Sequence, residues 1–424
     1  MSVRSIFPPA FFLASVPLGA CLSRSDDELI ERNHGAITSA EATILDFTFG
    51  AEVVTNNADA ARSAVVAQLL YAQGMLKSAS NASGQIGNAR ISDIVETPQG
   101  EKKRIAYKAS LPVAWPKDVT APTTYSLTLP LDVGARAAFN TKYDGRCGKS
   151  EGAQDDFWHV FNPSAQGCAL EDADVFRATA TIAARAAPAP AKYPEYGRIW
   201  EDDRLDVVAL FGIIEENRST DWGFREEQRF IDDAQQRLEG ASVVKNGTSA
   251  SVHDDTTLTG KITFDGRARD VKVDTLVVDD FASMGADFDT RYDALTEKAD
   301  LVLYNGHARH GRNLNALVRK GKVVAGKYQL VLLNGCESFA LVDTTLTDRR
   351  REVNGASDPE GTKFLDIVSN AQPGKANHLA TVSEVVYGAI LTRDAPLTYD
   401  ALVRKMPESH VVVVFGEEDN AFVP

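Results

Sequence analysis

Two short segments of the sequence carry the side chains best suited to covalent chemistry. Each runs an apolar stretch into Asn-Gly and then a reactive residue: residues 301–311 (LVLYNGHARHG) deliver His307, and residues 328–338 (YQLVLLNGCES) deliver Cys336. A short apolar run bounded by glycine predicts a buried strand of a parallel sheet, and such strands carry their chemistry on the loops at their carboxyl ends. We therefore expect an imidazole and a thiol at one sheet edge, where a thiolate nucleophile can form beside a proton carrier.

The two side chains divide the steps of an acyl-transfer reaction between them. An ordinary thiol has a pKa of about 8.5, and a neighbouring imidazolium favours its thiolate form. Cys336 would attack a carbonyl carbon and His307 would donate a proton to the leaving amine, with His310 as the alternative proton carrier. The backbone N–H groups of Ala308 and Cys336 are the expected oxyanion hole, and Gly335 lets the chain approach the substrate closely.

The pair of motifs resembles that of the caspase-like cysteine peptidases. An apolar strand leading to His307 and a second leading through a small residue to Cys336 are found in that group, which contains the caspases, legumains and gingipains. The resemblance covers residues 205–416 and implies peptide-bond hydrolysis by a cysteine thiolate, with the histidine as general acid and base. Ala308 stands where the family has glycine. Because alanine keeps its N–H, we expect a narrower pocket with the chemistry preserved.

Other interpretations of the same residues stay open. Cys336 could be an inert core cysteine, since unpaired cysteines are often buried. His307, His310 and Cys336 could ligate zinc. The chain could also be a binding module that keeps a peptidase-like scaffold without turnover. Asp279 and Asp280, which end the preceding predicted strand, could orient the histidine, line a substrate pocket or lie at a solvated strand end.

The amino-terminal residues predict export. An apolar segment follows Arg4, and Leu18-Gly19-Ala20 precede Cys21 in a pattern similar to the lipobox of bacterial lipoproteins. We expect residues 1–20 to be a signal peptide, Cys21 to be diacylated and residues 21–40 to be a flexible tether. The protein would then be anchored by lipid to the bacterial envelope, with the outer membrane as the expected location. An ordinary signal peptide is the alternative.

The remaining cysteines predict one disulfide and one free thiol. Cys147 and Cys168 flank a segment rich in glycine and aspartate, and an exported protein allows a bridge between them. This pairing leaves Cys336 unpaired in an oxidising compartment, where an odd thiol is either buried or kept for its reactivity. His159, within the closed loop, is expected to be structural.

The overall charge limits the expected partners. A formal net charge of -14 argues against nucleic acid, because binding phosphate requires clustered Lys and Arg. No segment reaches the roughly 20 apolar residues of a membrane-spanning helix. The expected partners are a peptide or protein substrate and the membrane lipid of the anchor, and no cofactor is expected. The acidic balance favours a basic residue at the cleaved position.

The chain divides at an Ala- and Pro-rich linker, residues 186–194. Residues 41–185 predict an α+β accessory domain without a catalytic signature. Residues 195–424 alternate between strands and helices, which predicts an α/β domain with a mostly parallel, caspase-like sheet and helices on both faces. Within it we expect a hairpin at Asp265-Gly266 and a helix near residues 359–370.

Overall fold

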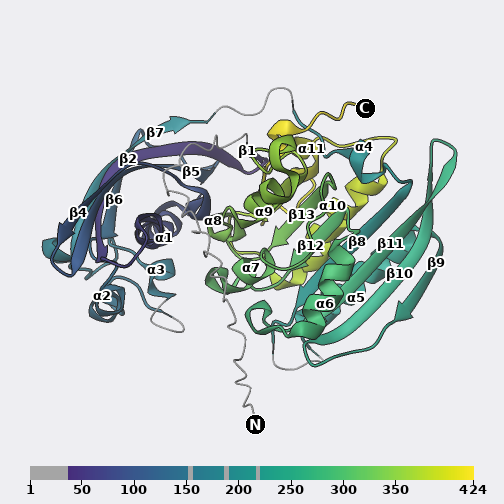
Figure 1. Ribbon diagram of the computed structural model, residues 1–424, viewed down its shortest axis with the longest axis horizontal. Helices are drawn as coiled ribbons and strands as arrows, with labels where there is room; N and C mark the ends of the chain where they lie inside the picture. The colour runs from purple at the N-terminus through teal and green to yellow at the C-terminus, as the bar shows by residue number, and fades with distance from the viewer. Residues whose placement is uncertain (1–36, 151–155, 186–190, 216–219) are drawn as a thin grey trace, which may run out of the picture.

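The chain forms two lobes, each built on its own β-sheet (Figure 1). The computed structural model describes residues 37–150, 156–185, 191–215 and 220–424. The predicted signal peptide, the lipidation site Cys21, most of the predicted tether and part of the linker lie outside these residues. No helix in the described part of the chain combines the length and the apolar character needed to cross a bilayer.

The N-terminal lobe wraps a curved antiparallel sheet around one long helix (Figure 1). The order along the sheet is β3 (Ser83–Gly84), β5 (Lys102–Pro116), β2 (Ala42–Asn56), β7 (Val175–Ala184) and β6 (Thr124–Pro130), with β4 (Arg90–Gln99) also paired to β5. Helix α1 (Ala61–Ser80) buries Leu69, Ala72 and Leu76 in the core of this lobe. Two shorter helices, α2 (Arg136–Tyr143) and α3 (Phe157–Val160), complete it.

The predicted disulfide between Cys147 and Cys168 is confirmed. Their Cα atoms lie 4.7 Å apart, and the bridge closes a segment that carries α3. Cys147 and Phe157 are both fully buried in the core of the lobe. The bridge therefore joins the two ends of the segment that carries α3.

The C-terminal lobe is built on a nine-stranded sheet. Its order is β1 (Ile37–Ser39), β15 (Val412–Phe415), β14 (Leu365–Asn370), β13 (Gln329–Asn334), β12 (Leu301–Asn305), β8 (Arg204–Gly212), β11 (Arg267–Val278), β10 (Val252–Phe264) and β9 (Glu239–Lys245). The five strands from β14 to β11 run parallel, whereas the two strands on each flank pair antiparallel. The sheet is mixed, so the expectation of a mostly parallel sheet is not confirmed. The predicted turn at Asp265-Gly266 explains one flank, because a tight hairpin returns the chain antiparallel.

Helices cover both faces of this sheet, as predicted. On one face, α5 (Trp222–Arg237) and α10 (Leu379–Leu391) pack against alternate strand residues such as Leu301 and Leu303. On the other, α6 (Ala286–Thr296) and α7 (Arg312–Leu317) pack against Val302 and Tyr304. Period-two alternation explains why each buried strand contributes to two cores. The remaining α-helices are α4 (Tyr196–Ile199), α8 (Ser338–Leu341), α9 (Thr345–Asn354) and α11 (Tyr399–Val403).

The predicted helix near residues 359–370 is wrong, because residues 365–370 form strand β14. All six residues of the strand are buried, and it pairs in parallel with β13. Its one carboxylate, Asp366, accepts hydrogen bonds from Tyr328, Tyr399 and Asn420. A short buried run does not reveal its own periodicity, and the pairing with β13 decides its conformation.

The end of the predicted tether is a strand of the C-terminal sheet. Residues 37–39 form β1, which pairs with β15 before the chain enters the N-terminal lobe at β2. The Thr38 hydroxyl donates to Oε1 of Glu417 at 2.5 Å. The first described residues therefore belong to the C-terminal sheet, although they precede the N-terminal lobe in sequence.

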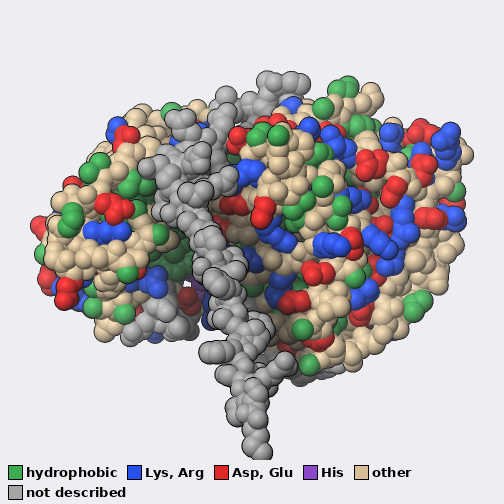
Figure 2. All heavy atoms as spheres, viewed as in Figure 1, with side chains coloured by type: hydrophobic (Ala, Val, Ile, Leu, Met, Phe, Trp, Pro, Cys, Tyr) green, Lys and Arg blue, Asp and Glu red, His purple; other side chains and the backbone are tan. Residues whose placement is uncertain are grey.

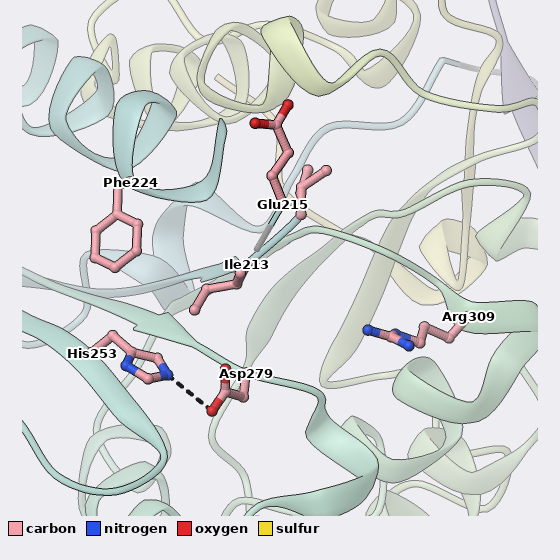
Figure 3. Close-up of a pocket in the computed structure, with 7 residues that line it drawn as sticks. Ile213, Glu215, Phe224, His253, Asp279 and Arg309 are labelled. Carbon is pink, nitrogen blue, oxygen red and sulfur yellow. Dashed lines mark ion pairs between the residues drawn. The ribbon is translucent and has the colours of Figure 1, made fainter. Parts of the chain in front are cut away.

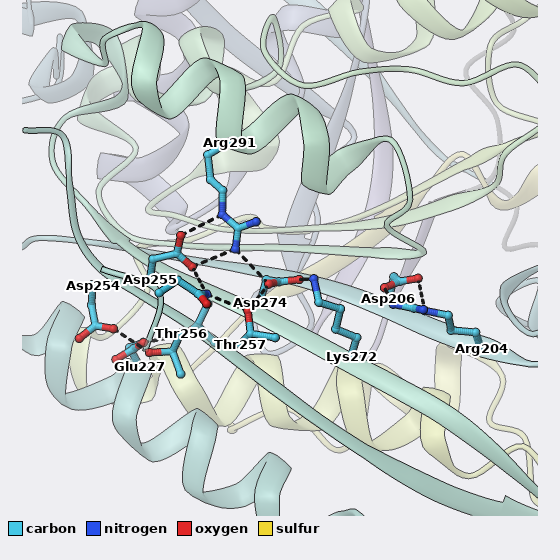
Figure 4. A network of polar contacts seen from close by, with 12 residues as sticks. Arg204, Asp206, Glu227, Asp254, Asp255, Thr256, Thr257, Lys272, Asp274 and Arg291 are labelled. Atoms are coloured by element: carbon cyan, nitrogen blue, oxygen red, sulfur yellow. Dashed lines mark hydrogen bonds and ion pairs between the residues drawn. The ribbon is translucent and has the colours of Figure 1, made fainter. Parts of the chain in front are cut away.

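A network of charged side chains anchors α6 to the β10–β11 hairpin (Figure 4). Arg291 of α6 donates to Asp255 of β10 at 2.8 Å and to Asp274 of β11 at 3.1 Å. Lys272 donates to the other oxygen of Asp274 at 2.6 Å. Because both carboxylates are almost fully buried, the loss of a partner would leave a buried charge uncompensated. The network fixes the segment between β11 and α6, which begins with Asp279 and Asp280.

The surface of the C-terminal lobe carries both signs of charge. On the face in Figure 2, Lys and Arg side chains intermingle with Asp and Glu, and neither sign gathers into a separate patch. Phosphate binding depends on concentrated positive charge. This face of the described residues offers no such concentration.

We predict that Glu417 makes the stability of the fold depend on pH. Burial raises the pKa of Glu417 to about 8, so the neutral carboxyl stabilises the fold at low pH and this stability is lost as pH rises towards 8. Replacing the acid by a permanently neutral group, Glu417→Gln, should raise the free energy of unfolding at pH 9 by on the order of 2 kcal/mol relative to the unsubstituted chain. The gain in the free energy of unfolding, measured by urea titration, should become smaller as the pH is lowered from 9 to 5.

Glu360→Gln is the matched control, since Glu360 is exposed. A gain for Glu417→Gln that is the same at pH 5 and pH 9 would contradict the assignment.

Candidate active site

The parallel register of β12 and β13 brings the two predicted motifs together. Asn305 of β12 lies opposite Asn334 of β13, and the amide of Gly306 donates to the carbonyl of Asn334 at 3.2 Å. His307 and Cys336 each follow their paired asparagine by two residues. They therefore stand on adjacent loops at the same edge of the sheet, as the sequence predicts.

The glycine of each motif permits a close approach between backbones. A Cβ atom at Gly335 would lie 3.3 Å from the carbonyl oxygen of Gly306 and 3.4 Å from the nitrogen of Ala308. A Cβ atom at Gly306 would lie 3.2 Å from the backbone of Gly212, at the end of β8. The loops after β8, β12 and β13 thus touch one another, and Ala308 lies beside Gly335, where the oxyanion hole is predicted.

A chain of buried amides ties the ends of three strands together. Asn334 donates from Nδ2 to Oδ1 of Asn305 at 2.8 Å, and Asn370 donates from Nδ2 to Oδ1 of Asn334 at 2.7 Å. The hydroxyl of Ser383 in α10 also donates to Oδ1 of Asn305, at 2.9 Å. Each asparagine is the last residue of its strand. We call Asn305, Asn334 and Asn370 the asparagine ladder; its third member was missed because β14 was mistaken for a helix.

The thiol of Cys336 is half-buried between two strand-end loops. Its Sγ lies 4.0 Å from the carbonyl oxygen of Gly374, in the loop after β14. Burial raises the pKa of the Cys336 thiol above its ordinary value, and the charge of Glu337 adds to this effect while that of Lys77 opposes it. The free protein therefore holds a protonated thiol at neutral pH, and a nucleophilic role requires a base beside it.

The backbone at His307 is fixed by two side chains. The hydroxyl of Tyr304 donates to the carbonyl oxygen of His307 at 2.6 Å, and Nδ2 of Asn313 donates to the same oxygen at 3.0 Å. The imidazole is half-buried. The backbone of His307 is thus held by two side chains of the same domain.

His310, the alternative proton carrier, contacts the N-terminal lobe. Its Nδ1 lies 2.9 Å from Oδ2 of Asp156, and its ring centre lies 4.6 Å from that of His159. Because one ring nitrogen is held by Asp156, the geometry favours His307 for proton transfer to a substrate.

Unusual backbone conformations concentrate in the two motif loops. Seven described non-glycine residues have a positive φ, and four of them are Asn or Asp, the types that adopt it most easily: Asn81, Asp93, Asp203 and Asp265. The other three are Arg309, His310 and Glu337. Residues held in this conformation at a cost of about 1–3 kcal/mol each often mark functional sites.

A cavity of about 490 Å³ opens beside the histidine loop (Figure 3). Its lining residues come from the loops after β8, β11 and β12 and from neighbouring elements: Ile213, Ile214, Glu215, Phe224, His253, Asp279 and Arg309. Figure 3 shows the guanidinium of Arg309 on one side and the paired His253 and Asp279 on the other. The cavity adjoins the loop that carries His307, because Arg309 of this loop lines it and Ile213 follows Gly212, whose backbone touches Gly306.

The structure gives the two predicted acids different partners. Asp279 lines the cavity and lies 2.9 Å from Nε2 of His253, while Oδ2 of Asp280 lies 3.6 Å from Nε of Arg309. Of the roles considered from sequence, a pocket-lining role therefore fits Asp279. Asp280 positions the Arg309 side chain two residues beyond His307.

Asp221 shapes the wall of the cavity. One oxygen of its buried carboxylate accepts from Gly223 at the start of α5, and the other accepts from the backbone of Ile214 at 2.7 Å and of Glu215 at 2.5 Å. One side chain thus caps a helix and fixes the loop that lines the cavity. The capping role could be expected from sequence, but the contact with the loop could not.

The zinc alternative lacks geometric support. Across the described ranges, no group of three or more His, Cys, Asp or Glu side chains is placed to hold a metal ion. His310 is instead paired with Asp156.

No family model matches the chain, and no curated protein matches its sequence.

We predict that the asparagine ladder stabilises the site. Asn334→Ala would remove the acceptor of the buried Asn370 amide and the donor to Asn305, so the free energy of unfolding should fall by about 2 kcal/mol. Urea titration of the full chain measures this loss.

Asn57→Ala is the control, because its exposed amide donates to the carbonyl of Gly100. An equal loss of unfolding free energy in the two variants would show that the asparagine ladder stabilises the fold no more than an exposed hydrogen bond does.

Proposed function

We propose that this protein is a cysteine peptidase that hydrolyses peptide bonds with Cys336 and His307, on a caspase-like domain. The observation that carries the proposal is the register of β12 and β13, which puts the loops of the two residues side by side. The parallel order β11-β8-β12-β13-β14 and the cavity beside the histidine loop add support.

The proposed reaction begins with proton transfer from Cys336 to His307. The thiolate sulfur attacks the carbonyl carbon of the scissile bond, forming a C–S bond and an oxyanion. As this intermediate collapses, the C–N bond breaks and His307 gives its proton to the leaving amine. Water, deprotonated by His307, then attacks the thioester, releasing a carboxylic acid and restoring the thiol.

The backbone N–H groups of Ala308 and Cys336 would stabilise the oxyanion. Both belong to loops whose backbones touch through Gly335. Donors fixed before the reaction need no reorganisation as charge develops, which is the main electrostatic contribution of such holes.

The cavity would receive the side chain of the residue at the cleaved position. Glu215 and Asp279 contribute two carboxylates to it, and Ile213 and Phe224 contribute apolar surface for a long aliphatic stem. Arg309 is held towards Asp280 by its ion pair. This combination favours an Arg or Lys side chain.

We further propose that the protein is exported and anchored by lipid at Cys21 to the bacterial envelope, where its substrates are peptides or proteins. The disulfide between Cys147 and Cys168 supports an oxidising compartment. The lipobox-like residues before Cys21 support the anchor.

One observation favours a second candidate, a peptide-binding module without turnover. Burial raises the pKa of the Cys336 thiol, which disfavours the nucleophilic form in the free protein. A catalyst and a binding module differ in whether His307 can remove this proton when a substrate is bound.

We predict that peptide hydrolysis depends on Cys336 and His307 but not on His310. Cys336→Ala should abolish hydrolysis of a fluorogenic peptide library, and His307→Ala should lower kcat/KM by about a thousandfold, since it removes the base and the acid. His310→Ala is the matched control and should retain most of the activity. Turnover by Cys336→Ala equal to that of the unsubstituted chain would exclude the cysteine mechanism.

We predict a preference for basic residues at the cleaved position. On substrates with Arg, Lys, Asp or Asn at that position, Arg and Lys should be cleaved best, and Asp279→Asn should reduce their advantage over Asn about fivefold. Asp118→Asn, at an exposed position in the N-terminal lobe, is the control. A preference for Asp would contradict the assignment of the pocket.

A further inference from the structure

The N-terminal lobe touches each of the three loops at the catalytic edge of the sheet. In the loop after β12, Nδ1 of His310 lies 2.9 Å from Oδ2 of Asp156. In the loop after β13, Oε2 of Glu337 lies 2.7 Å from Nε2 of His159. In the loop after β14, Gln372 donates to the carbonyl of Asn81 at 2.6 Å. The lobe that carries no catalytic motif therefore contacts the surroundings of both proposed catalytic residues.

Glu337, the residue directly after Cys336, is the most enclosed of these contacts. Only 2% of its side chain is exposed, and its two oxygens face different partners from the N-terminal lobe. Nζ of Lys77 lies 2.9 Å from Oε1, and Nε2 of His159 lies 2.7 Å from Oε2. A buried carboxylate without partners would be strongly destabilising, so these contacts keep Glu337 ionised and in place.

Burial and the neighbouring groups shift the pKa of Glu337 in opposite directions. Burial alone would raise its pKa, but the hydrogen bond and charge of His159, together with the charge of Lys77, outweigh burial and hold the pKa below its ordinary value. A carboxylate is therefore fixed beside the thiol of Cys336 throughout the neutral pH range.

The elements that present Lys77 and His159 are tied into the N-terminal lobe. Lys77 lies in the last turn of α1, whose apolar face is buried in the lobe. His159 lies in α3, within the segment closed by the disulfide, and the amide of Asn162 donates to the carbonyl of Cys147 at 2.7 Å. Both side chains can thus hold Glu337 in one position.

The backbone conformation of Glu337 affects the position of Cys336, the proposed nucleophile. Its φ of 53° is a conformation that a glutamate adopts at a cost, and its amide donates to the carbonyl of Gln372 at 3.3 Å. Because Cys336 is the preceding residue, the turn at Glu337 sets where the thiol points.

We propose that Lys77 and His159 are positioning residues for the reaction at Cys336, acting through Glu337. They hold the turn after the nucleophile and offset the negative charge that Glu337 places beside the thiol. This inference rests on the proposed peptidase function, and it makes the N-terminal lobe part of the catalytic unit.

Several groups must be considered in any pH measurement on this cluster. Lys77 comes from α1 and His159 from α3, and His310 approaches His159 from the loop after β12. Asp156 pairs with His310, and the thiol of Cys336 adjoins Glu337. The variants below therefore change one charge at a time.

The proposal is tested by measuring how fast iodoacetamide alkylates Cys336 in the full chain at a series of pH values. Mass spectrometry of the Cys336 peptide gives the alkylation rate, and the midpoint of the curve of rate against pH reports the pKa of the thiol. Lys77→Gln leaves the charge of Glu337 less compensated, so the midpoint should rise by about one pH unit and alkylation at pH 7 should slow about tenfold. Lys77→Arg should keep the midpoint. Lys108→Gln, which removes an exposed ion pair with Asp93 in the same lobe, is the control and should also keep it.

Glu337→Gln supplies the complementary measurement. It removes the charge that Lys77 and His159 offset, so the midpoint should fall, and adding His159→Gln to it should cause little further change. A purely structural role would lower thermal stability without moving the midpoint. Unchanged midpoints in Lys77→Gln and in Glu337→Gln would overturn the proposal.

Peptide hydrolysis, measured on the same samples, separates this inference from the function on which it rests. If the unsubstituted chain cleaves no peptide while its alkylation profile responds to Lys77→Gln as expected, the proposed function fails and the control of the thiol stands. If the chain cleaves peptides and the kcat of Lys77→Gln equals that of Lys108→Gln, the positioning role fails and the function stands.

Discussion

The register between β12 and β13 is the constraint on which the rest of the site depends. Side chains alternate along a strand, so a slip of one residue would move Asn305 or Asn334 to the wrong face and separate the two motif loops. The buried amide contacts between these residues and Asn370 oppose such a slip, because a displaced amide would lose its partner in an apolar interior. The same interactions thus stabilise the sheet and align its functional edge.

Sequence reasoning succeeded where the determining interactions are local. The apolar runs before His307 and Cys336, the turn at Asp265-Gly266 and the short-range pairing of Cys147 with Cys168 were all interpreted correctly. Local signals failed for β14, where six buried residues fit more than one conformation until a neighbouring strand is known. The mixed character of the sheet was missed as well. On one flank β1 pairs with β15, which is distant in sequence, whereas the antiparallel hairpin on the other flank was expected.

The contacts between the lobes could not be predicted from sequence. His159 and Glu337 are 178 residues apart, and nothing in the sequence links the two residues. Only the folded chain reveals that Glu337 is buried, that its backbone is strained and that its charge is met by Lys77. One hydrophobic cluster extends from Leu69 in the N-terminal lobe to Leu341, just beyond the cysteine loop, so the polar contacts are supported by apolar packing.

Strand β1 has a consequence for how this protein can be divided. It covers the outer edge of β15, although it precedes the whole N-terminal lobe in sequence. A fragment that starts at the linker, with residues 195–424 alone, would leave the backbone amides and carbonyls of β15 unpaired along that edge. Open edges of this kind recruit other chains and promote aggregation. The boundary visible in the sequence is therefore not a place where the polypeptide can be cut to yield a well-behaved C-terminal fragment.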